Sequence, residues 1–121
     1  MTIAVDFDGT ITTRNVYPDI GEFRENAIEV LKALQNQGND ICLWTCRHGE
    51  SLVAALKALE EKGFKPNYVN CGPFTTGSTK MVANLYIDDA AWPNVLLPEE
   101  KRVDWDLIAK SFHLTDEDLN G

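Results

Sequence analysis

Two aspartates stand one residue apart near the start of the chain, Asp6 and Asp8, and Gly9 follows directly. The apolar segment that carries them, residues 2–7, reads as a buried strand, in which residues i and i+2 point to the same side. Two carboxylates held on one side repel each other and attract a divalent cation, a proton or both. Asp-Gly is also a common turn, so a plain turn after a strand is the alternative interpretation.

Elements of alternating type must position this pair. Apolar segments bounded by turn residues predict four strands, at residues 2–7, 41–45, 67–70 and 84–87. Apolar residues at helical spacing predict helices over 23–34 and 52–59, which Gly38 and Gly63 close, and a last helix within 98–114. Residues 115–121 are short and acidic, and we expect a frayed tail after a single domain of residues 1–114.

Strands that alternate with helices predict an α/β fold with right-handed crossovers and a parallel, doubly wound sheet. Ligands bind such sheets beyond the carboxyl ends of the strands. Asp6 and Asp8, then Thr45, then Asp88 and Asp89 all follow the end of a predicted strand. We therefore expect these side chains to share one rim of the sheet, although they are far apart in sequence.

These residues together fit the hydrolysis of a phosphate monoester. That reaction needs a nucleophile, an acid for the leaving oxygen and positive charge around the transferring group. Asp6 can attack phosphorus, while Asp8 can protonate the leaving alcohol and later take a proton from water. Asp88 can join Asp6 and a backbone carbonyl in an oxygen shell that suits Mg²⁺, and Asp89 can bind the ion directly or through water.

The other two candidates are Thr45, whose hydroxyl and amide can bind phosphate oxygens, and Lys80, whose ammonium can also hold Asp6. Each has a plain alternative, because a threonine after a strand is often a cap and a lysine before a helix is often solvated. The order of all these groups along the chain is what favours a phosphate site.

This combination resembles the haloacid dehalogenase superfamily of phosphohydrolases. The matching segments are Asp6-Phe7-Asp8-Gly9-Thr10, then Leu43-Trp44-Thr45-Cys46-Arg47, then Lys80, then Tyr86-Ile87-Asp88-Asp89. The resemblance implies a three-layer Rossmann-like sheet in which the fourth strand lies beside the first. It also implies Mg²⁺ as cofactor, with Asp6 as nucleophile and the backbone carbonyl of Asp8 on the metal. The second aspartate, which dehalogenating members lack, points to phosphoryl transfer.

Members of that superfamily usually carry an inserted cap domain, and neither gap between the motifs has room for one here. The chain resembles a capless, minimal member, whose open site could admit a bulky substrate or be covered by a neighbouring subunit in a homo-oligomer. Cys46 and Arg47 are candidates for substrate binding next to Thr45, and Arg14 and Tyr17 could shape substrate choice. A surface arginine at a helix start is the alternative for Arg47.

Composition limits the partners and the compartment. The formal net charge of −8 disfavours nucleic acid or an anionic membrane as the main partner, without excluding a local basic site, and we expect a phosphorylated small molecule. Three cysteines without CxxC spacing argue against a disulfide framework and a thiolate zinc site. The N-terminus shows no secretory pattern, and no apolar run approaches the roughly 20 residues of a membrane span, so we expect a cytoplasmic protein.

Two other functions remain open. A phosphoacceptor switch of the response-regulator type also places carboxylates, a threonine and a lysine around Mg²⁺, but its acceptor aspartate ends the third strand. Here that position holds Asn70-Cys71, which counts against the switch. A binding module whose inherited site has decayed is the third possibility, and the intact set of core residues counts against it.

Overall fold

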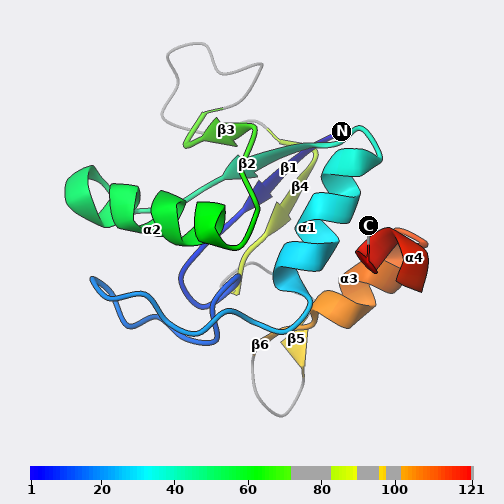
Figure 1. The fold of residues 1–121 in the computed structure, drawn as a ribbon, viewed down its shortest axis with the longest axis horizontal. Coiled ribbons are helices and arrows are strands. Elements are labelled where there is room, and N and C mark those ends of the chain that lie inside the picture. The colour runs from blue at the N-terminus through cyan, green and yellow to red at the C-terminus, as the bar shows by residue number, and fades with distance from the viewer. Residues whose placement is uncertain (72–82, 90–95, 98–101, 121) are drawn as a thin grey trace.

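Four parallel strands form the central sheet of the computed structural model, which describes residues 1–71, 83–89, 96–97 and 102–120 (Figure 1). The strands lie in the order β3-β2-β1-β4. Their bounds are β1 Thr2–Val5, β2 Asp40–Leu43, β3 Tyr68–Val69 and β4 Leu85–Ile87. The predicted parallel α/β fold is therefore confirmed, with each strand shorter than its apolar segment.

The central strand β1 has a parallel neighbour on both sides. Val5 pairs with Leu43 of β2 on one side and with Ile87 of β4 on the other. The three strands therefore end level with one another, and the residues after them emerge along one edge. Because β2 and β4 lie on opposite sides of β1, the strand order reverses between β1 and β4. In open α/β sheets such a reversal is where ligands bind.

The main core lies on one face of the sheet. Ile3, Val5 and Leu43 point into it, where they meet side chains of three helices. These helices are α1 (Ala27–Asn36), α2 (Gly49–Glu61) and α3 (Trp105–Ser111). On the other face a smaller cluster centres on Ala4 and Cys42. Residues 72–82 lie outside the described ranges, and the three-layer arrangement stays a prediction.

The first helix begins later than its apolar spacing predicts. Phe23 forms an isolated antiparallel bridge with Thr12 and packs edge-on against Phe7, with ring centroids 6.2 Å apart. The helix starts only at Ala27, after Asn26 in the left-handed conformation (φ 68°). Tertiary contacts of Phe23 therefore override its helical spacing, whereas Gly38 (φ 92°) follows the helix end as expected.

The C-terminal region holds two features that the sequence did not predict. The strands β5 (Leu96–Leu97) and β6 (Arg102–Val103) form an antiparallel pair before α3. The expected frayed tail instead forms a short helix, α4 (Asp116–Asn120), which contacts α1. Thr115 and Asp118 exchange hydrogen bonds at its start, and Leu119 packs against the core. The hydrogen bonds at Thr115 cap this helix and Leu119 anchors it to the core, so the prediction of a frayed tail is corrected.

In the part of the chain that the structure describes, no helix is long and apolar enough to cross a membrane.

Candidate functional site

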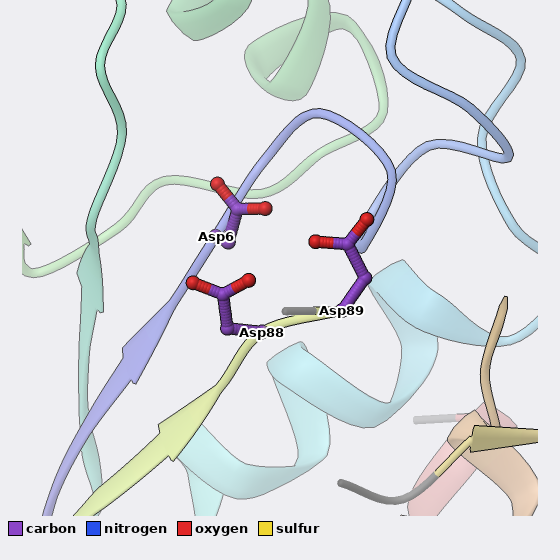
Figure 2. Close-up of side chains that lie close together, drawn as sticks. All are labelled: Asp6, Asp88 and Asp89. Atoms are coloured by element: carbon purple, nitrogen blue, oxygen red, sulfur yellow. The ribbon is translucent and has the colours of Figure 1, made fainter. Parts of the chain in front are cut away.

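Three carboxylates gather where β1 and β4 end side by side. Asp6 follows β1, and its amide donates to the Ile87 carbonyl of β4 at 3.0 Å. Asp88 and Asp89 come directly after Ile87. Each of the three half-buried acids offers an oxygen within 4.8 Å of the others. Figure 2 shows the three carboxylates facing a common space between the two strand ends. The prediction that these acids share one rim is confirmed.

Burial and the neighbouring carboxylates change the acidity of Asp6. Burial, and next the negative charge of Asp88, raise the pKa of Asp6 from 3.8 to about 7, with a smaller contribution from Asp89. A hydrogen bond from Thr10 acts in the opposite direction. Clustered carboxylate oxygens that repel one another are the donor set of a hard divalent cation. The described residues therefore fit an ion such as Mg²⁺.

The turn after β1 brings its backbone against the cluster. Gly9 has φ +81°, and a Cβ at this position would lie 2.6 Å from Asp89 Oδ2. Only glycine combines this backbone conformation with this clearance. The Gly9 turn is thus part of the site, and the interpretation of Asp8-Gly9 as a plain turn misses its close approach to a carboxylate.

Sequence reasoning gave no role to Thr10, which links the two strand ends. Its side chain is fully buried. The hydroxyl donates to Asp6 Oδ2 at 3.1 Å and accepts from the amide of Asp89 at 3.1 Å. The indole nitrogen of Trp105, in α3, donates to the Thr10 carbonyl at 2.9 Å. Its place in the motif directly after Gly9 was the one feature of the sequence that could have pointed to Thr10. No feature of the sequence pointed to its contact with Trp105.

Asp8 does not join this acidic cluster. Its two carboxylate oxygens accept from Arg47, Oδ2 from Nε and Oδ1 from Nη2, each at 2.7 Å. The strand β1 ends at Val5, so the extended geometry assumed for Asp6 and Asp8 does not continue through both residues. The two side chains therefore do not converge on one site, which would have required extended geometry through both residues. A contact of the Asp8 backbone carbonyl with a metal stays a prediction.

Arg47 is buried, with only 2% of its surface exposed. Besides Asp8, its guanidinium donates to backbone carbonyls of Pro18, Asp19 and Ser51. This geometry matches neither sequence-based alternative, because Arg47 is not a surface residue and its donors are directed into the protein. The sequence could show that Arg47 was near the rim but could not show which acid it would meet.

The remaining predicted site residues follow β2 or lie outside the described ranges. The Thr45 amide donates to Asn70 Oδ1 at 2.8 Å, so in this structure it does not offer the predicted contact to phosphate. The Thr45 hydroxyl oxygen accepts from the amide of Arg47 at 3.1 Å. Cys46 is exposed. Lys80 lies outside the described residues, and its predicted roles stay predictions.

Comparison with known proteins gives one informative match. No family model and no curated protein matches the chain. A solved structure of a conserved protein from Bacteroides thetaiotaomicron superposes with a TM-score of 0.78 at 35% sequence identity, over 100% of this chain and 98% of that one. The chain belongs to the same family as this Bacteroides protein. The similarity extends over the whole described fold.

Proposed function

We propose that the protein is a Mg²⁺-dependent phosphatase of the haloacid dehalogenase type, which hydrolyses phosphate monoesters of small molecules. The observation that carries the proposal is the cluster of Asp6, Asp88 and Asp89 at the point where the strand order reverses. The order β3-β2-β1-β4 supports a Rossmann-like arrangement of this type, with the proposed nucleophile directly after the central strand.

The three clustered carboxylates, with the backbone carbonyl of Asp8, would hold the Mg²⁺ ion. When bound, it would supply the positive charge that lets a phosphate dianion approach an acidic site. In the protein alone, burial and then the negative charge of Asp88 raise the pKa of Asp6, and the second of these causes is the same kind of repulsion between negative charges. A protein that needs a cation to lower this repulsion should therefore lose activity when the cation is removed.

The protein's own residues then divide the reaction. Asp6 attacks phosphorus and carries the phosphoryl group as an aspartyl-phosphate, while the hydroxyl of Thr10 fixes the orientation of its carboxylate. Asp8 enters the reaction protonated, passes this proton to the leaving alcohol and regains one from the water that cleaves the intermediate. The Thr45 hydroxyl and the Lys80 ammonium bind the transferring phosphoryl group.

The substrate proposed here is a phosphorylated small molecule in the cytoplasm. The net charge of −8 disfavours a polyanionic partner such as nucleic acid. Because the connections between the motifs are short, we expect no cap from the same chain over the site, and a second copy of the protein could cover it in a homo-oligomer.

Hydrolysis of an aryl phosphate tests the proposal. We expect release of the phenol to require Mg²⁺, to stop with EDTA and to fall at least about 10³-fold in Asp6→Asn, which lacks the nucleophile. Asp40→Asn is the matched control, because Asp40 starts β2 at the opposite edge of the sheet. Full activity in Asp6→Asn, or equal loss in both variants, would contradict the proposal.

A non-enzymatic phosphoacceptor or Mg²⁺- and phosphate-binding regulatory module is the second candidate. This candidate needs no proton transfer by Asp8, whose two carboxylate oxygens accept from Arg47 in the structure. Such a module would accept a phosphoryl group on Asp6 from a small phosphodonor and retain it without turnover. Multiple turnovers per protein molecule would exclude this alternative.

A further inference from the structure

The guanidinium of Arg47 uses its whole donor capacity inside the protein. An arginine has five N–H donors, and the structure records five hydrogen bonds from this side chain, two to Asp8 and three to backbone carbonyls. Its carbon Cζ also lies 5.4 Å from the centre of the Phe7 ring and 5.2 Å from that of Tyr17. No donor remains to bind the phosphate of a substrate.

These bonds join three separate parts of the chain. Asp8 follows β1, the carbonyls of Pro18 and Asp19 belong to the excursion after it, and the carbonyl of Ser51 lies in the first turn of α2. A buried ion pair is a weak source of net stability, because desolvation of both charges offsets their attraction. Its two-pronged geometry, by contrast, fixes the plane and the rotation of the carboxylate. This favours a role for Arg47 in orientation.

We propose that Arg47 is a positioning residue, which acts on the reaction through Asp8 and does not touch the substrate. The inference rests on the proposed function, in which Asp8 is the group that moves protons. Both Asp8 oxygens accept from Arg47, so the Asp8 side chain, only 10% exposed, is held in one orientation two residues after the nucleophile. Without the guanidinium, the carboxylate can rotate about its side-chain bonds and loses this alignment.

The kinetic consequence is specific. Misplacement of a reacting group by about 1 Å can cost on the order of 10²-fold in rate. Arg47→Lys keeps a positive charge but cannot make the two-pronged contact or reach all three carbonyls. We expect kcat of this variant to fall about 10–100-fold, with KM changed less than about threefold, because the phosphate contacts remain.

A double-mutant cycle separates action through Asp8 from a general structural role. The variants are Arg47→Lys, Asp8→Asn and their combination, assayed with an aryl phosphate and Mg²⁺. Once Asp8→Asn has removed proton transfer, we expect Arg47→Lys to lower kcat by less than about threefold more. Because folding can depend on the buried arginine, the thermal unfolding midpoint of each variant is also measured. In a further variant, Arg47→Met combined with Asp8→Leu replaces the pair by apolar side chains of similar shape. This last variant should fold yet show the low kcat of Asp8→Asn.

Nitrogen-15 NMR supplies a readout that does not depend on activity. The buried Arg47 Nε–H should give a resonance protected from exchange with water, which shifts or is lost in Asp8→Asn. A raised KM with unchanged kcat in Arg47→Lys would overturn the inference, as would kcat losses that multiply in the double variant. Wild-type protein without turnover would instead remove the proposed function, and the inference with it.

Discussion

Replacement of Asp6 by asparagine removes one of three clustered negative charges while it keeps the shape of the side chain and the acceptor for Thr10. The metal-free wild-type protein holds the Asp6 pKa at about 7, against 3.8 for an unperturbed aspartate, with burial as the first cause and Asp88 as the second. The folded state therefore binds the Asp6 proton more tightly than the unfolded state does. Stability must then fall as pH rises from about 4 to about 7, because the unfolded chain loses this proton first.

A shift of about three pH units corresponds to a ceiling of about 4 kcal/mol. Asp6 is partly exposed, and solvent screening reduces the expected penalty to about 1–3 kcal/mol. Asp6→Asn carries no charge at any pH and escapes this penalty. In EDTA, we therefore expect Asp6→Asn to be more stable than wild type by about 1–3 kcal/mol at pH 8, with the difference shrinking towards pH 5.

Urea unfolding followed by circular dichroism at several pH values measures this difference. Asp40→Asn, at the opposite edge of the sheet, should follow the wild-type profile. A difference between Asp6→Asn and wild type that does not change with pH would refute the argument, and so would a wild type that is the more stable protein at pH 8.

Four further predictions rest on the same contacts. Asp88→Asn should weaken Mg²⁺ binding at least about tenfold, as measured by isothermal titration. The affinity of the wild-type protein for Mg²⁺ should rise as the pH increases through about 7, because Asp6 loses its proton there. Gly9→Ala should lose about 1–3 kcal/mol of stability and most Mg²⁺ binding, whereas Gly38→Ala, with φ +92° and nothing within 4 Å of its Cβ, should lose stability alone. Trp105→Phe removes the donor to the Thr10 carbonyl. It should lower the free energy of unfolding in urea by about 1–3 kcal/mol and also lower kcat. An unchanged free energy of unfolding would count against a role for this hydrogen bond.

The sequence predicted the parallel sheet and the meeting of the acids at its edge. Buried parallel strands can be recognised in the sequence by their apolar composition, and their carboxyl ends lie at the same edge of the sheet. The proximity of Asp6 and Asp88 could therefore be predicted without knowledge of any side-chain contact. The predicted helix starts were less accurate, because the helical spacing of Phe23 competes with its packing against Phe7.

The side chains that contact Asp8 and Thr10 could not be predicted from the strand pattern. Arg47 is 39 residues from Asp8, and Trp105 is 95 residues from Thr10. Hydrophobic periodicity says which face of an element is buried, but it does not say which buried polar group meets which. An arginine such as Arg47 has five N–H donors, which can bind a carboxylate or a substrate phosphate equally well. The sequence does not show which of the two it binds, and only the fold decides between them.

The claim that Asp6 is a nucleophile is tested most directly by the fate of the phosphoryl group during turnover. The protein is mixed with an aryl phosphate and Mg²⁺, quenched in acid within one turnover and digested, and the peptides are examined by mass spectrometry. We predict a phosphoryl group on Asp6 that is present at early times, decays as substrate is consumed and is absent when EDTA replaces Mg²⁺. Turnover without phosphorylation of Asp6, or with the phosphoryl group on another residue, would contradict the proposed function.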